Sequence, residues 1–118
     1  ASTNTPQQAL VLLNDPQFVE CAGALARLVL AEADDDPARC TALFRRLAGR
    51  APQADELAEL CTLLVDARAS FAADPDAVEA LRAAAATELP LGSGVPDWAA
   101  LCITASTVLA LDAVVSVR

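Results

Sequence analysis

The sequence predicts an all-α protein, a compact array of about six helices packed in an orthogonal or bundle-like way. The chain of 118 residues is 55% hydrophobic but only 3% aromatic. Most of that apolar content is Ala and Leu, which lose little conformational freedom in a helix. Only 4 residues are Gly, and β-branched residues cluster mainly in the last twenty positions, so no series of strands separated by turns can be drawn. This length fits one domain over residues 1–118.

The first helix is expected over residues 6–13. Thr5 offers an N-cap hydroxyl, and Pro6 fits the first helical position because its φ is fixed. Gln8 stands where a capping box places its reciprocal acceptor. Asn14 tolerates the left-handed conformation in which helices often end.

The same capping device repeats at the next two helix starts. Asp15 and Pro16 open a second helix that runs to about Ala33. Asp36 and Pro37 cap a third helix, which Gly49 ends. The predicted inward faces follow the three-and-four spacing of an amphipathic helix. They comprise Phe18, Cys21, Ala22, Leu25 and Val29 in the second helix, and Cys40, Leu43, Phe44 and Leu47 in the third.

Three further helices are expected in the second half of the chain. The fourth covers about 52–72 with acids in its first turn, where the helix dipole favours them. Asp74 caps a fifth helix over about 75–86, and Pro90, Gly92 and Gly94 make residues 87–95 a loop. The last helix begins at Pro96. The inward faces of these helices comprise Leu57, Leu60, Cys61, Leu64 and Phe71, then Val78 and Leu81, and finally Trp98, Leu101, Cys102, Ala105 and Leu109.

Aromatic side chains are expected to anchor the core. They are Trp98, Phe18, Phe44 and Phe71. The indole N–H of Trp98 needs a partner when buried, so this residue should join the last helix to the second or the fourth.

The charge balance excludes several partners. A net charge of −8 leaves no basic face to release counterions from nucleic acid or to bind an anionic lipid surface. The longest apolar run, residues 101–117, carries Asp112 inside it and is typical of a buried helix rather than a membrane span. We expect neither nucleic-acid binding nor membrane insertion.

The four cysteines, Cys21, Cys40, Cys61 and Cys102, provide little metal chemistry. The chain has no His and no Cys-x-x-Cys pair, so we expect no metal site, no covalent haem and no cofactor in this segment. All four lie on predicted apolar faces, where a thiol behaves as a small hydrophobe. Buried thiols and at least one disulfide both remain open, and the spacing does not choose among the three full pairings.

No catalytic residue is expected. Without His or Lys, a Ser or Cys nucleophile would depend on a carboxylate base. The candidate acids are accounted for as caps and first-turn residues. These are Asp15, Asp36, Asp55, Glu56, Asp74 and Asp97.

Two polar groups could bind a ligand. Asn4, Gln8, Asn14 and Asp15 form the densest polar group, and they either satisfy backbone groups at a helix junction, which we favour, or line a site. Three arginines end the third helix, where they complement its dipole or could hold a carboxylate or sulfate. They are Arg45, Arg46 and Arg50.

The chain resembles the C-terminal part of the planctomycete family called domain of unknown function 1553. The resemblance is carried by residues 4–18, by Gly49-Arg50 with Pro52, by Glu56-Leu57, and by Trp98 followed by Leu109 and Asp112. At the end the chain departs from the family pattern. Ala110 stands for the usual Asn, and Ala113 and Val114 stand for Glu-Phe.

The resemblance implies a piece of a large exported protein, periplasmic or secreted, in which any haem-binding, cytochrome c-like segment lies far upstream. Proteins of this family are encoded in bacteria that degrade sulfated polysaccharides. An exported origin raises the expectation of disulfides, and the resemblance implies no catalytic residues.

The sequence therefore favours a non-catalytic structural or interaction module whose partners are the remaining domains of its own parent chain. In one alternative, this segment contributes polar contacts to an enzyme or carbohydrate-binding site in polysaccharide degradation, through Asn4, Gln8, Asn14, Asp15 and Arg50. In a second alternative, a redox partner docks on the acidic face.

Overall fold

Five helices make up the described part of the chain. The computed structural model describes residues 16–85 and 95–116, with side chains over 17–85 and 95–109. The helices are α2 (Pro16–Glu32), α3 (Asp36–Ala48), α4 (Ala54–Ala73), α5 (Pro75–Ala85) and α6 (Val95–Ser116), and no strand occurs in these ranges. The all-α prediction is confirmed. The helix expected over 6–13 and most of the loop expected over 87–95 lie outside the described residues, so five helices are seen rather than six.

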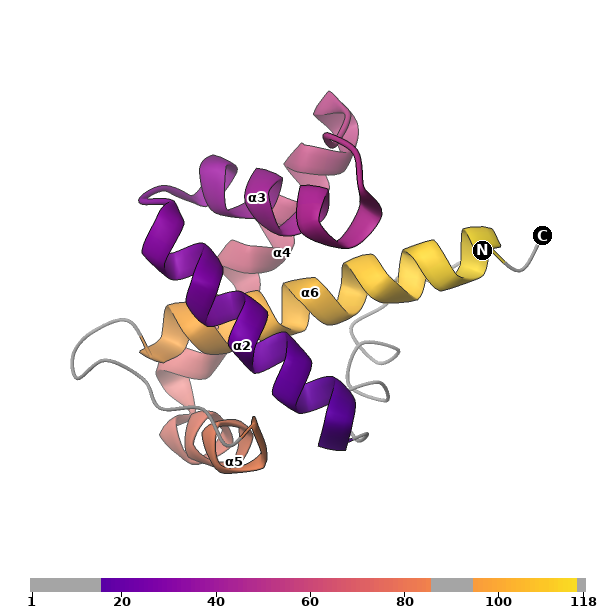
Figure 1. Cartoon of the computed structure of the whole chain (residues 1–118). Coiled ribbons are helices and arrows are strands. Elements are labelled where there is room, and N and C mark those ends of the chain that lie inside the picture. Colours follow the sequence, from indigo (N-terminus) through magenta and orange to yellow (C-terminus); the bar gives the residue numbers. More distant parts are fainter. Residues whose placement is uncertain (1–15, 86–94, 117–118) are drawn as a thin grey trace.

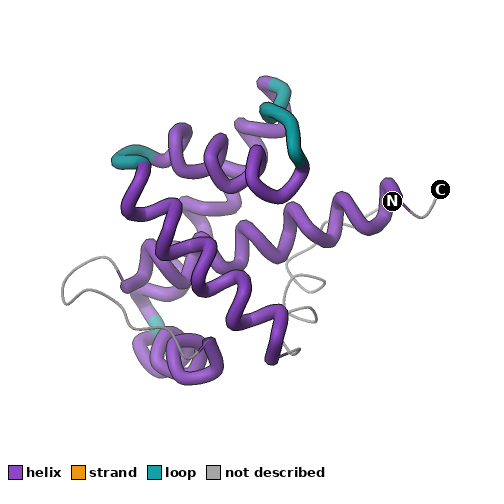
Figure 2. Tube along the Cα trace, viewed as in Figure 1, coloured by secondary structure: helices purple, strands orange, loops and turns teal. Residues whose placement is uncertain are grey.

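The four other helices surround α6. It packs against α2, α3, α4 and α5, and Figure 1 shows α2 crossing it on one side and α4 passing behind it. The connections that follow α2, α3 and α4 are short, as the teal segments of Figure 2 show. Short connections place consecutive helices side by side.

The central position of α6 is reflected in its burial on all sides. Every side chain from Trp98 to Val108 is buried, which exceeds the single buried face that the sequence predicted. A helix that is apolar around its whole circumference is a core helix. The hydroxyls of Thr104, Ser106 and Thr107 each donate to a carbonyl four residues earlier, so these polar groups are satisfied inside the core.

The helix α2 has a narrower buried stripe. Its buried hydrophobic residues recur at spacings of three and four, as Val19, Ala22, Ala26, Val29 and Ala33, the last of which directly follows the helix. Phe18 and Leu25 are partly buried beside this stripe. The prediction that Cys21 faces the core is wrong, because Cys21 lies off the stripe and is exposed.

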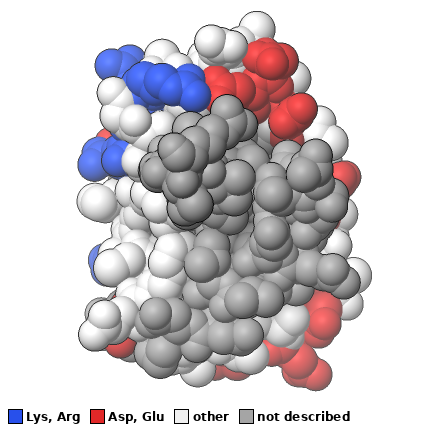
Figure 3. All heavy atoms as spheres, turned by 90° about the vertical axis from the view of Figure 1, so that its right-hand side faces the viewer, with Lys and Arg blue, Asp and Glu red and all other residues white. Residues whose placement is uncertain are grey.

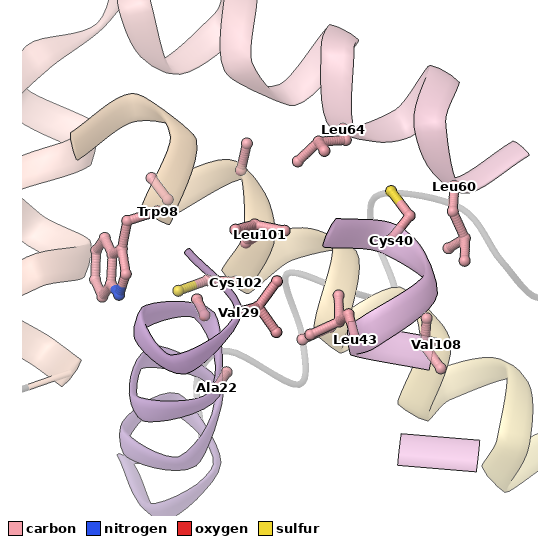
Figure 4. Packing of buried hydrophobic residues seen from close by; sticks show 14 of the residues in the cluster. Ala22, Val29, Cys40, Leu43, Leu60, Leu64, Trp98, Leu101, Cys102 and Val108 are labelled. Atoms are coloured by element: carbon pink, nitrogen blue, oxygen red, sulfur yellow. The ribbon is translucent and has the colours of Figure 1, made fainter. Parts of the chain in front are cut away.

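The aromatic anchors occupy the expected places. Trp98 is fully buried, and its Nε1 donates a hydrogen bond of 2.9 Å to the carbonyl oxygen of Gly23 in α2. The predicted link between the last helix and the second is therefore confirmed, and Figure 4 shows the ring beside α2. Phe44 is buried, while Phe18 and Phe71 are partly buried against the same cluster.

The helix ends are capped largely as the sequence predicts, with one correction. The N-cap of α3 is Asp35 rather than Asp36, because the Oδ1 of Asp35 accepts a 2.8 Å hydrogen bond from the N–H of Ala38. Asp36 is instead the first helical residue. Gly49 ends α3 with a φ of 76°, a left-handed conformation that side chains disfavour.

The capping residue between α4 and α5 agrees with the prediction. Asp74 accepts a hydrogen bond of 3.2 Å from the N–H of Ala77.

Across residues 16–85 and 95–116, no helix is both long and apolar enough to cross a membrane.

Candidate functional site

The densest group of charged side chains lies where α3, α4 and α6 meet. Asp36 and Arg39 stand one turn apart near the start of α3, Arg68 lies in the second half of α4, and Asp97 lies in the first turn of α6. We call these four residues the charge cluster. Each side chain retains between 16% and 32% of its exposure, so the cluster is partly desolvated.

Arg68 is the centre of the charge cluster. Its Nη2 donates to Oδ1 of Asp36, and its Nε lies 2.5 Å from Oδ1 of Asp97. The second contact is an ion pair without an aligned hydrogen bond, since Nε has no acceptor of suitable geometry. The hydrogen bond to Asp36 is the main cause that raises the pKa of Arg68 above its ordinary value.

Arg39 ties the cluster to α2. Its Nη1 lies 3.7 Å from Oδ2 of Asp97, and its Nε donates a 3.0 Å hydrogen bond to the carbonyl of Ala33, just after the last turn of α2. A cation at that end complements the helix dipole. The two arginines and two aspartates thus neutralise one another. Their contacts join α3, α4 and α6 to one another and to the end of α2.

A pair of thiols adjoins the charge cluster. Cys40, one turn after Asp36 on α3, is fully buried, and Cys61 of α4 lies close enough to act on its pKa. Burial, followed by the neighbouring Cys61, raises the pKa of Cys40 to about 12. Burial also raises the pKa of Cys102 in α6.

The chemistry available to this region is limited by these pairings. A thiol with such a raised pKa is protonated at neutral pH and is a weak nucleophile. The carboxylates of the cluster are held by arginines. No group of three or more metal-ligating side chains occurs within the described residues. The arrangement joins α3, α4 and α6 through paired charges.

Arg50 is engaged rather than open to a ligand. Its Nη1 and Nη2 donate to the two carboxylate oxygens of Glu56, at 2.8 and 2.9 Å. Its guanidinium also lies 4.8 Å from the centre of the Phe44 ring. Arg46 similarly forms a two-bond pair with Glu32 of α2. Arg46 and Arg50 therefore join the end of α3 to α2 and α4 through paired carboxylates.

The other predicted site residues lie outside the described residues. These are Asn4, Gln8, Asn14 and Asp15. The choice between a helix junction and a ligand site at these four positions stays a prediction. The structure has all four cysteines as free thiols, and a disulfide between any two of them likewise stays a prediction.

Sequence reasoning did not single out Arg39 or Arg68. A signal for Arg68 exists, because it falls four residues after Leu64 and three before Phe71, on the stripe that faces the core. A cation on such a stripe requires a carboxylate partner. Which aspartates supply it depends on the packing of three helices, which the local pattern does not contain.

The described residues form an all-α fold in which the arginines and aspartates of the charge cluster are paired with one another. Residues 1–64 match the model of the PSD1 family, described as a protein of unknown function (DUF1553). This match covers more than half of the chain, so the chain belongs to that family. The C-terminal placement and the planctomycete origin stay predictions. No curated protein and no solved structure matches the chain.

Proposed function

We propose that this chain is a non-catalytic structural or interaction module of a large exported protein, and that its partner is the rest of its own parent chain. The observation that carries the proposal is the self-neutralised charge cluster. Its arginines bind aspartates of the same domain, and the adjoining Cys40 thiol is protonated at neutral pH. Charged side chains that bind one another support the fold. They leave no catalytic group free in the charge cluster.

The proposal extends to placement and localisation. The resemblance of the chain's motifs to the C-terminal part of the family, and not the family match itself, is what supports a C-terminal position in a planctomycete protein that is periplasmic or secreted. It also supports a segment without a cofactor of its own, with any haem-binding part elsewhere in the parent chain.

Charge supports a protein partner over nucleic acid or an anionic membrane. The net charge is −8, and Figure 3 shows acidic side chains in several groups along the right-hand side of one face, the uppermost group beside arginine side chains. Such a surface repels phosphate and steers cationic protein surfaces toward itself. Docking of a redox partner on these acidic side chains is an alternative function. It would also be binding without catalysis.

The carbohydrate-site alternative is weakened by Arg50. Its guanidinium is held by both oxygens of Glu56 and stacks on Phe44. A sugar or sulfate would have to displace that carboxylate. An interaction module is therefore the function that the described residues support best.

The test is a binding measurement between this chain and the remainder of its parent polypeptide, expressed separately. Isothermal titration calorimetry should show saturable one-to-one binding that weakens as salt is added, because the contact is partly electrostatic. The Trp98→Ala variant is the control, since disrupting the core should abolish binding that needs the folded domain.

Two results would contradict the proposal. One is an absence of binding at any salt concentration. The other is release of reducing sugar from a sulfated polysaccharide by this chain alone, with loss of that activity in Arg50→Gln.

A further inference from the structure

Two cysteines from different helices meet at the packing surface between α3 and α4. Cys40 belongs to the buried face of α3 together with Leu43 and Phe44. Cys61 stands on α4 beside Leu60, on the stripe that packs against the same core. In Figure 4 the sulfur of Cys40 points toward α4, between the labelled Leu60 and Leu64.

The two thiols are neighbours across this packing surface. Cys61 follows Leu60 and precedes Leu64 in the sequence, and the Cys40 sulfur lies between these two α4 side chains in Figure 4. Cys61 is also close enough to act on the pKa of Cys40. A disulfide requires β-carbons a few ångströms apart and directed toward one another, which two neighbouring thiols on facing helices approach without a large helix movement. The other two cysteines differ in position, since Cys21 is exposed on α2 and Cys102 is buried in α6.

The two thiols of the pair differ in access to solvent. Cys40 is fully buried, whereas Cys61 is partly exposed. A dissolved oxidant can therefore reach Cys61 first and cannot reach Cys40 directly. This order matches a pair in which one thiol is attacked from solution and the other completes the bond.

We propose that Cys40 and Cys61 form an oxidisable dithiol that closes into a disulfide between α3 and α4 on reaction with a small-molecule disulfide. The proposal is independent of the proposed function, because it concerns a modification within this domain and needs no partner.

The reaction proceeds by two thiol–disulfide exchanges. The thiolate of Cys61 attacks one sulfur of oxidised glutathione, which forms a mixed disulfide and releases one glutathione thiolate. The thiolate of Cys40 then attacks the sulfur of Cys61 and releases the second. The protein dithiol loses two electrons, the glutathione disulfide gains them, and the two protein thiol protons end on the released glutathione.

The charge cluster affects the second exchange because two of its residues change the pKa of Cys40. Asp36 raises the pKa of Cys40 and Arg68 lowers it, with burial as the largest cause of the net increase. The Cys40 thiolate is therefore scarce, and its attack should be the slower exchange. The position of Cys61 next to Cys40 compensates, because an intramolecular thiol acts at high effective concentration.

The sequence makes the pairing easy to identify. Trypsin cleaves after Arg, and the eight arginines place the four cysteines in four different peptides. Cys40 lies in the peptide 40–45 and Cys61 in the peptide 51–68, while Cys21 and Cys102 lie in 1–27 and 83–118. Each of the possible disulfides therefore gives a distinct linked pair of peptides.

The experiment treats the whole chain with oxidised glutathione, blocks remaining thiols with N-ethylmaleimide and digests without reductant. Mass spectrometry should find 40–45 joined to 51–68 at least about tenfold more often than any other linkage. The Cys21→Ala variant is the matched control and should give the same result. In Cys40→Ala, glutathione should remain attached to Cys61, because no second thiol displaces it.

A thermal measurement separates a native link from an accidental one. The oxidised chain should melt several degrees higher than the reduced chain, and dithiothreitol should reverse the increase. Three outcomes would overturn the proposal. They are a dominant linkage through Cys21 or Cys102, stable glutathione on Cys61 in the unmutated chain, or a 40–45 to 51–68 link that lowers the melting temperature.

Discussion

At the scale of single residues, Trp98 is the largest fully buried side chain among those described. It is the only Trp in the chain, it is fully buried, and its indole N–H joins α6 to α2 through Gly23. Trp98→Phe keeps an aromatic ring but removes the donor and some volume. We expect a loss of about 2 kcal/mol in the free energy of unfolding, measured by urea denaturation.

A surface substitution on the partner helix controls for this measurement. Leu28 lies on α2 and is 53% exposed, so Leu28→Ala should change stability by less than about 0.5 kcal/mol. If both variants cost the same, the contact between Trp98 and Gly23 does not anchor α6.

The two aspartates that directly precede α3, Asp34 and Asp35, provide a second test at residue scale. Asp35 accepts the hydrogen bond from Ala38, so Asp35→Ala should lower the free energy of unfolding by about 1 kcal/mol. Asp34→Ala is the matched control and should have a smaller effect, because Asp34 precedes the cap. Thermal unfolding followed by circular dichroism compares the two, and an equal loss in both variants would reject Asp35 as the cap.

At the scale of elements, Glu56 locks the turn between α3 and α4. It accepts from the guanidinium of Arg50 and, at 2.9 Å, from the N–H of Gln53 just before α4. The Arg50 hydrogen bond, followed by that of Gln53, lowers the pKa of Glu56 from 4.5 to about 2. A carboxylate whose folded pKa is depressed stabilises the fold above its unfolded pKa and loses this contribution as pH falls through the folded value.

The corresponding pH window lies between about 4.5 and about 2. Over this range the melting temperature of the unmutated chain should fall more steeply than that of Glu56→Gln. Arg50→Gln should flatten the profile in the same way, because it removes the main cause of the pKa shift. Parallel profiles for all three proteins would show that this ion pair does not contribute to acid stability.

Arg68 holds three elements at one point. Arg68→Ala would leave Asp36 and Asp97 facing each other without their shared cation. The expected loss is about 2 kcal/mol, between the values typical of exposed and of buried ion pairs. Adding Asp36→Asn and Asp97→Asn to Arg68→Ala should recover part of the loss, since the repulsion disappears. No recovery in denaturant titrations would mean that packing, rather than charge, sets the cost.

At the scale of the whole molecule, one buried cluster includes residues from all five described helices. Shared burial of this kind favours all-or-none unfolding, which would support the prediction of a single domain over 1–118. Trp98 fluorescence reports on the core and far-ultraviolet circular dichroism reports on helix content. We expect the two denaturation curves to coincide, and separate midpoints would show that the chain contains more than one folding unit.

The helices could be predicted from the sequence, but the contacts between helices could not. The proline-led starts of α2, α3 and α5 could be identified because their signals are local, lying within one helical turn. The interior stripes of α3 and α4 were also predictable from spacing. In contrast, Cys21 was misplaced because an Ala-rich helix offers several faces of similar hydropathy, and only the packed neighbours decide which one is buried.

The candidate site was less predictable for the same reason. Asp36 and Asp97 were correctly placed at helix starts, but nothing local indicates that Arg68, 32 residues after Asp36, would bind both of them. The pairing of Cys40 with Cys61 also depends on how α3 packs on α4. These contacts join distant parts of the chain, and a single sequence specifies them only through the completed fold.

The position of α6 has a consequence for the order of synthesis. A ribosome makes α2 to α5 first, yet the helix that fills the space among them is translated last of the five. Until residue 108 has left the exit tunnel, the apolar faces of α2 to α5 that pack on α6 lack that helix, and exposed apolar surface of this kind favours aggregation. A product truncated before residue 95 should therefore be degraded rather than accumulate as a smaller folded domain.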